Sequence, residues 1–215
     1  MAKLKFIDNI SGLQAIQLLR FSTFLIISIV FTKSHLSRAQ IGNWELFLFI
    51  SSLLSFFWVS GIIQSLLTLY NRNRTFREDG EAEGRKSPEL FNAFLLLTFF
   101  SILVFAMGIP VKIMLASARV EPEIPYANLL LLYILLSNPV TLIEYIYLLN
   151  KRPHRVIQYG IYTYSAQMLF VLAPVVSGFD ERSAIWGLFA ITAIRWVWLI
   201  ILLRPMLIVF NSLVV

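Results

Sequence analysis

The chain has 215 residues, of which 58% are hydrophobic and 14% are charged, and its mean hydropathy is +0.76. Soluble domains carry about 25% charged residues, so this composition excludes an ordinary soluble domain and indicates an integral membrane protein. The net charge of +6 does not indicate nucleic-acid binding, because the basic residues lie mostly in loops between apolar segments. The absence of cysteine excludes disulfides, thiolate nucleophiles and cysteine metal sites.

Six apolar segments are long enough to cross a membrane as helices, since about 20 helical residues span the hydrocarbon core. The sequence therefore predicts an all-α polytopic membrane protein with six transmembrane helices in one bundle over residues 1–204. The expected spans are approximately 11–32, 41–70, 89–112, 126–149, 156–178 and 184–204. Residues 205–215 form a mostly apolar tail that is too short to span, and we expect it to lie in the interface, to dock on a partner or to begin a connector.

The Lys and Arg residues of the loops set the expected orientation of these spans. With the N-terminus inside, the inner side holds Lys3, Lys5, Arg72, Arg74, Arg77, Arg85, Lys86, Lys151, Arg152, Arg155 and Arg204. The outer side then holds only Lys33, Arg38, Lys112, Arg119 and Arg182. Because positive residues concentrate on the cytoplasmic side of membrane proteins, both termini are expected in the cytoplasm.

The first span contains an arginine, Arg20, which lies roughly 13 Å inside the start of the helix at the helical rise per residue. A charge at such depth costs at least about 2.5–3.5 kcal/mol, so Arg20 is expected to face a bundle interior or a hydrated cavity. At 100° per residue, Gln17, Arg20 and Thr23 lie within about 120° of arc. We expect these three side chains to line one surface.

The second span follows a polar link, residues 33–40, and begins at Ile41. Late in this span, small or hydrogen-bonding residues share one helical face. They are Ser60, Gly61, Gln64 and Thr68. Small residues let helices approach each other and an amide can bond across them, so Gly61 and Gln64 are expected to pack against a neighbouring helix or to contribute to a binding surface.

The loop at residues 71–87 carries both basic and acidic residues and is expected to be a solvated connector. Ser87 is the expected N-cap of the third span, with Pro88 at its first position and Glu89 near the positive end of the helix dipole. The third span is almost free of polar groups, so much of its surface is expected to face lipid.

The fourth span contains Asn138-Pro139 near its middle, where a proline removes a backbone hydrogen bond and kinks the helix. Beyond the kink lies Glu144, the one acidic residue well inside a predicted span. Two interpretations of Arg20 follow from this. Either it forms an ion pair with Glu144, or it binds an anion in a cavity.

The fifth and sixth spans each carry polar residues at helical spacing. In the fifth, Gln158, Tyr162 and Ser165 form a stripe that is expected to face other helices. In the sixth, Arg195 lies three residues after Thr192. Arg195 is expected to line the cavity, to extend toward the interface, or to stack on Trp196 or Trp198.

The motifs of common enzymes are missing from this sequence. There are no Asp pairs at metal-binding spacing in a span, no phosphate loop, no Gly-x-Ser-x-Gly and no His-Glu-x-x-His. The two histidines, His35 and His154, stand alone, so no metal or other cofactor is expected. The sequence therefore predicts a protein that is not an enzyme.

Three features resemble the amino-terminal lobe of the polysaccharide and oligosaccharide-lipid flippases of the multidrug/oligosaccharidyl-lipid/polysaccharide exporter superfamily. They are Arg20 in the first span, the entry Ile41-Gly42-Asn43-Trp44, similar to the Phe-Gly-x-Tyr pattern of that family, and the segment Gly61-Ile62-Ile63-Gln64-Ser65-Leu66. The resemblance implies a multi-pass protein of the bacterial cytoplasmic membrane, in which two six-helix lobes enclose a cavity. It also implies that cationic residues hold the phosphate of a lipid-linked sugar, and Arg20 matches such a position.

The chain supplies one lobe where that family has two, which leaves several functions open. It pairs with a second lobe, as a homo- or hetero-oligomer, or it is half of a longer protein, or it is a membrane subunit or scaffold of an envelope or secretion assembly that does not transport. The flippase hypothesis takes membrane lipid and a lipid-linked glycan as partners. Its candidate substrate-binding residues are Arg20, Gln17, Thr23, Gln64, Glu144 and Arg195.

Overall fold

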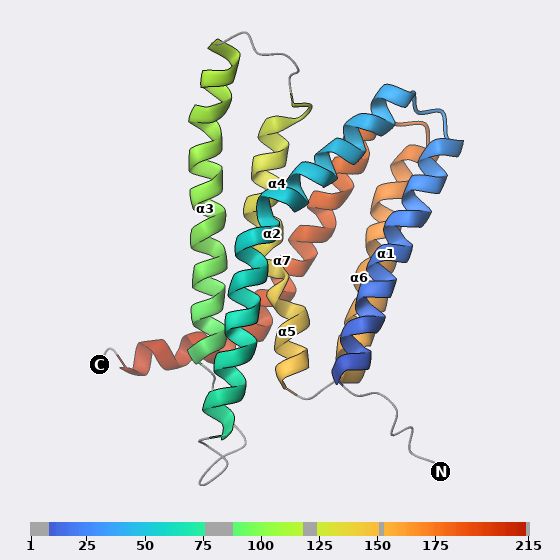
Figure 1. Ribbon diagram of the computed structural model, residues 1–215. Helices are drawn as coiled ribbons and strands as arrows, with labels where there is room; N and C mark the ends of the chain where they lie inside the picture. The colour runs from blue at the N-terminus through green and yellow to red at the C-terminus, as the bar shows by residue number, and fades with distance from the viewer. Residues whose placement is uncertain (1–8, 76–87, 118–123, 151–152, 214–215) are drawn as a thin grey trace, which may run out of the picture. The chain divides into compact units, whose positions relative to one another are not determined.

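The computed structural model describes residues 9–75, 88–117, 124–150 and 153–213, and every regular element in these ranges is an α-helix (Figure 1). The helices are α1 (Asn9–Lys33), α2 (Arg38–Thr75), α3 (Pro88–Ser117), α4 (Ala127–Val140), α5 (Leu142–Leu149), α6 (Pro153–Val176) and α7 (Glu181–Leu213).

Six stretches of these helices are long and apolar enough to cross a membrane. They are Gly12–Lys33, Arg38–Arg72, Pro88–Pro110, Ala127–Leu149, His154–Val176 and Glu181–Arg204. The prediction of an all-α protein with six membrane-spanning segments is confirmed, and the chain is a multi-pass membrane protein. Large apolar side chains are exposed along these spans, as hydrocarbon contact requires; those of α3 include Leu95, Phe99, Ile102 and Met107.

The chain divides into two compact units, each built from separate parts of the sequence. The first unit comprises Met1–Leu46 and Ile143–Arg195, and the second comprises Phe47–Leu142 and Trp196–Val215. Helices α2 and α7 each contribute one part to each unit.

In the first unit, α1 packs against α6, and α6 approaches α7 closely. Gly160 permits the first contact, because a Cβ there would lie 2.7 Å from Cγ1 of Ile16. Gly187 permits the second, because a Cβ there would collide with the backbone carbonyl of Phe170.

The start of α2 also belongs to the first unit, and this helix begins at Arg38 rather than at the expected Ile41. A capping box explains the earlier start. The main-chain N–H of Ser37 donates to Oε1 of Gln40 at 2.9 Å, and the main-chain N–H of Gln40 donates to Oγ of Ser37 at 3.2 Å. The Gln40 amide also donates to Oδ1 of Asp180 at 3.3 Å, which connects this cap to the link before α7.

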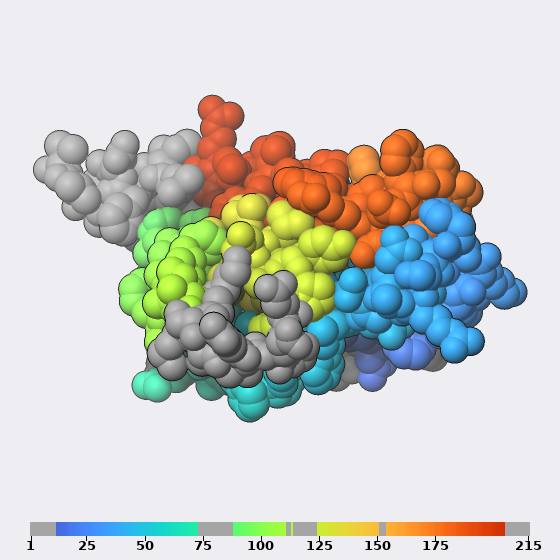
Figure 2. Space-filling model, turned by 90° about the horizontal axis from the view of Figure 1, so that it is seen from above, coloured from blue at the N-terminus to red at the C-terminus, as the bar shows by residue number. Residues whose placement is uncertain are grey.

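In the second unit, α3 and α4 lie side by side (Figure 1 and Figure 2). The Trp58 ring of α2 stacks on the Phe100 ring of α3, with centroids 5.8 Å apart. The indole N–H of Trp196, on the part of α7 in this unit, donates to the carbonyl of Leu136 on α4 at 2.8 Å.

The predicted kink in the fourth span is confirmed, because α4 ends at Val140 and α5 begins at Leu142. Pro139 has no N–H to continue the ladder of main-chain hydrogen bonds. Thr141 closes the break, since its N–H donates to the carbonyl of Asn138 at 3.2 Å and its hydroxyl donates to the same oxygen at 2.6 Å.

The end of the chain differs from the sequence expectation. Helix α7 continues through Pro205 to Leu213, so residues 205–213 are helical and continuous with the sixth span instead of forming a separate tail. A docking or interfacial role for this segment stays a prediction. In the loop at 71–87, residues 71–75 belong to α2, and 76–87, including the expected N-cap Ser87, lie outside the described residues.

Candidate functional site: a charged cluster in the first unit

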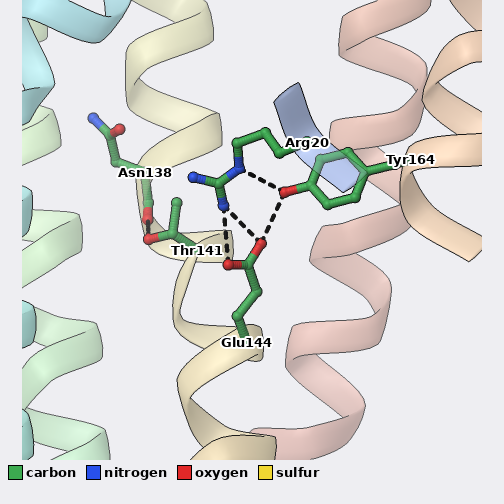
Figure 3. A network of polar contacts seen from close by, with 5 residues as sticks. All are labelled: Arg20, Asn138, Thr141, Glu144 and Tyr164. Carbon is green, nitrogen blue, oxygen red and sulfur yellow. Dashed lines mark hydrogen bonds and ion pairs between the residues drawn. The ribbon is translucent and has the colours of Figure 1, made fainter. Parts of the chain in front are cut away.

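Three polar side chains from α1, α5 and α6 form a closed ring of hydrogen bonds (Figure 3). Nη2 of Arg20 donates to both carboxylate oxygens of Glu144, at 2.9 Å each. Nε of Arg20 donates to the hydroxyl of Tyr164 at 2.7 Å, and that hydroxyl donates to Oε1 of Glu144 at 3.1 Å. The ring thus joins three helices that are far apart in the sequence.

All three residues lie within membrane-spanning segments, where a charge is costly unless it is paired. The Glu144 side chain is 4% exposed, and the ion pair with Arg20 compensates its burial. Of the two interpretations that the sequence left open for Arg20, the ion pair with Glu144 is therefore confirmed. The Arg20 side chain also keeps 36% of its surface exposed, and the anion-binding interpretation stays a prediction.

The guanidinium of Arg20 uses only part of its donor capacity within this ring. Figure 3 shows that its other terminal nitrogen, Nη1, points away from both Glu144 and Tyr164 and takes no part in the dashed contacts drawn there. A guanidinium has five N–H donors in a fixed plane, so one edge of the group can be held while another meets a ligand.

A second arginine, Arg195 on α7, lies against the same tyrosine. Its Cζ is 5.4 Å from the centroid of the Tyr164 ring, and that of Arg20 is 5.9 Å from the same centroid, both within cation–π range. The Tyr164 ring is a partner that the sequence did not indicate for Arg195, and stacking on Trp196 or Trp198 stays a prediction. The indole N–H of Trp196 donates to a main-chain carbonyl of α4 in the second unit.

Tyr164 itself was missed by the sequence reasoning, which assigned the wrong face of this helix to the interior. Gln158, Tyr162 and Ser165, the stripe that was expected to face other helices, are exposed. The buried polar residues of α6 lie on the opposite face and are Tyr159, Thr163, Tyr164 and Gln167. Gly160, where α1 approaches α6 closely, lies on that buried face. This glycine is the feature of the sequence that could have indicated which face is buried.

Gln17, Arg20 and Thr23 do not all line one surface as expected. Thr23 is 6% exposed and lies on the buried face of α1 with Ile16 and Ile27. Gln17 is exposed, because it lies about a quarter turn from this face at 100° per residue.

Gln64 belongs to the second unit and is exposed there. The hydroxyl of Thr68 donates to the Gln64 carbonyl at 2.9 Å, a local bond within α2. The expected close packing at Gly61 is wrong, because a Cβ there would have nothing within 4 Å. Gly61 instead lines a groove between α2 and α3.

Arg20 does not line either of the following two hollows on the surface of the described residues. One is the groove at Gly61, and the other is a hollow in the first unit lined by Val30, Lys33, Ser34, His35, Val175 and Val176. Within the described ranges, no group of three or more His, Cys, Asp or Glu side chains is placed to hold a metal ion.

The chain was compared with known proteins at the level of sequence and of structure. No family model, no curated protein and no solved structure matches it. What the charged cluster can do therefore follows from its own geometry.

Proposed function

We propose that the chain is one lobe of a flippase that moves a lipid-linked saccharide across the bacterial cytoplasmic membrane, with both termini in the cytoplasm. In this proposal Arg20 binds the phosphate of the lipid carrier, and a second lobe completes the cavity. The observation that carries it is the state of Arg20, which is fixed by Glu144 and Tyr164 while Nη1 points away and 36% of the side chain is exposed.

Holding one edge of a guanidinium lowers the entropy lost when its other edge binds a ligand. Arginine suits phosphate because its planar fork matches the phosphate oxygens and its hydrogen bonds to them are charge-assisted. Arg195 lies over the ring of Tyr164, the residue that also contacts Arg20. It therefore adds a second positive charge near the same point. These features favour an anionic ligand.

The break between α4 and α5 supports transport for a separate reason. Membrane transporters commonly place their binding sites at interrupted helices, where the two halves are able to move. Glu144 is the third residue of α5 and follows directly after the break. A change in the direction of α5 would therefore act on the ion pair that holds Arg20.

A second function, a membrane subunit or scaffold that does not transport, is favoured by the closure of the ring. Arg20, Glu144 and Tyr164 satisfy one another and join three helices, which is also what a static assembly requires. This alternative predicts that the cluster stabilises the fold and binds no phosphate.

The direct test is binding of a polyprenyl-diphosphate-linked disaccharide to the purified full chain, with whatever partner copurifies, in lipid nanodiscs. Arg20→Met is expected to weaken binding by about 10- to 100-fold, the effect of one charge-assisted hydrogen bond. Arg38→Met, which removes an exposed arginine at the start of α2, is the matched control and should leave binding unchanged.

Equal binding by folded Arg20→Met and by the native chain would exclude the phosphate-binding role. In cells, glycan export that persists in a normally expressed Arg20→Ala variant would exclude it as well. Mass measurement in detergent tests the second lobe, because a stable monomer that binds the probe with full affinity would contradict the need for one.

A further inference from the structure

Helix α6 carries an exposed polar stripe within its membrane-spanning segment, His154–Val176. The stripe consists of Gln158, Tyr162 and Ser165, and all three residues are exposed, Tyr162 by 66%. At 1.5 Å per residue they lie about 6, 12 and 17 Å along the helix from His154. The stripe therefore runs from one end of the span to its middle.

The stripe points away from α1, the helix that packs on α6 in the first unit. Figure 1 shows α1 and α6 side by side, and Gly160 marks the side of α6 that α1 approaches. At 100° per residue, the three residues of the stripe lie about 140–200° from Gly160. They thus share a narrow arc on the opposite side of the helix.

Hydrocarbon cannot satisfy these side chains. Within the described ranges, the side chains of Gln158, Tyr162 and Ser165 form no hydrogen bond. A polar group without a hydrogen bond is costly in an apolar surrounding, so polar side chains of a span favour contact with other helices. A serine hydroxyl can donate to a carbonyl of the preceding turn, and Gln158 and Tyr162 therefore have the stronger need for an outside partner.

The stripe continues as an apolar seam on the same side of α6. Leu169, Ala173 and Val176 are exposed and lie within the same arc of about 80°. From Gln158 to Val176 the exposed residues of this arc follow one another at spacings of three or four, the pattern by which two helices pack along their length. The small side chains of Ser165 and Ala173 permit a close approach.

We propose that this face of α6 binds the same face of α6 in a second copy of the chain, around a two-fold axis along the membrane normal. Such an axis makes the two helices parallel and brings each residue of the stripe beside its counterpart. An amide, a phenol and a serine hydroxyl each donate and accept hydrogen bonds, so the stripe is complementary to itself. It carries no charge that a copy would repel, because the exposed basic residues His154 and Arg155 lie in the first turn of α6, where water and salt screen them.

This interface assigns the second lobe of the proposed flippase to a copy of this chain, and in that respect it rests on the proposed function. The interface itself follows from α6 alone and also suits a static assembly. Its test therefore measures association and not phosphate binding.

The test makes use of the absence of cysteine from the chain. A single cysteine, Ser165→Cys, is introduced into the full chain in native membranes, and copper phenanthroline is added to oxidise thiols to disulfides. A disulfide needs Cβ atoms about 3.5–4.5 Å apart, so it forms efficiently only where two copies meet. The expected product is a dimer with twice the mass of the 24.7 kDa chain. Ser52→Cys, at an exposed serine in the span of α2, is the matched control and should give little dimer.

The second measurement is energy transfer between labelled copies in liposomes over a series of protein-to-lipid ratios, which gives the dissociation constant of the dimer. Gln158→Leu/Tyr162→Phe/Ser165→Ala removes the three polar groups. It is expected to raise the dissociation constant about 20-fold, from the average strength of an interhelical hydrogen bond in a membrane. Gln14→Leu/Ser52→Ala, which removes an exposed amide and an exposed hydroxyl from other spans, should leave the constant unchanged.

Equal dimer yields for Ser165→Cys and Ser52→Cys would overturn this interface, and so would a native dissociation constant in the triple variant. A Ser165→Cys product of a different mass would assign this face to another protein and overturn the second copy. A dimer through α6 that binds no polyprenyl diphosphate would contradict the flippase proposal only. Binding of that probe by a chain that does not associate through α6 would overturn this inference only.

Discussion

Removal of one partner of the Arg20–Glu144 ion pair is expected to destabilise the protein more than removal of both. The perturbation is Glu144→Leu, which leaves the Arg20 guanidinium inside a membrane span without the carboxylate that it contacts at 2.9 Å through both oxygens. The reciprocal change, Arg20→Met, leaves a carboxylate whose side chain is only 4% exposed.

Loss of one partner of a buried ion pair costs about 3–5 kcal/mol of unfolding free energy, because the remaining charge is uncompensated. Since 36% of the Arg20 side chain is exposed, we expect Glu144→Leu to cost about 3 kcal/mol, at the lower end of that range. Arg20→Met should cost at least as much, about 3–5 kcal/mol, because it leaves a carboxylate whose side chain is only 4% exposed without its counter-ion. The double variant, with apolar side chains at both positions, should lie within about 1 kcal/mol of the native protein.

The assay is reversible unfolding in mixed micelles, followed by tryptophan fluorescence, for the native chain, both single variants and the double variant. Arg38→Met serves as a control for the loss of a positive charge outside the cluster. If the cost of the double variant equals the sum of the single costs within about 0.5 kcal/mol, the two side chains are not coupled and the ion pair does not stabilise the fold.

Three further predictions test the contacts around this pair. Tyr164→Phe keeps the ring under Arg195 but removes the hydroxyl that bridges Arg20 and Glu144, so the same unfolding assay should show a loss of about 1–2 kcal/mol; no loss would mean that the hydroxyl does not bridge them. Gly187→Ala should lower the unfolding free energy by about 2–3 kcal/mol, because the new Cβ meets the fixed backbone of Phe170. Gly160→Ala should lower it by only about 1 kcal/mol, because the Ile16 side chain can move. The reverse order would contradict this packing. Ser37→Ala removes the capping box of α2 and should speed hydrogen exchange in the first turn of that helix, with a cost of about 1 kcal/mol; unchanged exchange would contradict the cap.

The six spans were predictable because their signal is local. Each span needs only a sufficient run of apolar residues, and the chain carries few charges outside its loops. The ion pair was predictable as one of two alternatives for a related reason, since a charge inside a span must find a partner and Glu144 was the one acidic residue at suitable depth.

The third member of the ring was not predictable from helical periodicity alone. Helix α6 carries polar residues on two opposite faces, and a period of 3.6 residues identifies faces without stating which one is buried. Packing determines which face of α6 is buried. Gly160 lets α1 approach one face, and this approach buries Tyr164 on that side.

The hydropathy of the sequence does not predict the division into two units either. Helices α2 and α7 pass from one unit to the other without a change in composition that marks the point. The boundary in the fourth span is different, because it falls between Leu142 and Ile143, directly after the break caused by Pro139. There the sequence does carry a signal, but a proline indicates a kink and does not distinguish a kink from a boundary between units.

The double variant Arg20→Met/Glu144→Leu also separates the two proposed functions. In a static subunit the pair acts only by joining helices, so a double variant of near-native stability should keep the assembly and the function of its partners. In a flippase lobe the same variant should fold and assemble but neither bind the polyprenyl diphosphate nor export glycan, because the guanidinium that meets the phosphate is gone. A stable double variant that still exports glycan would contradict the flippase proposal, and a stable one that has lost export would contradict the scaffold.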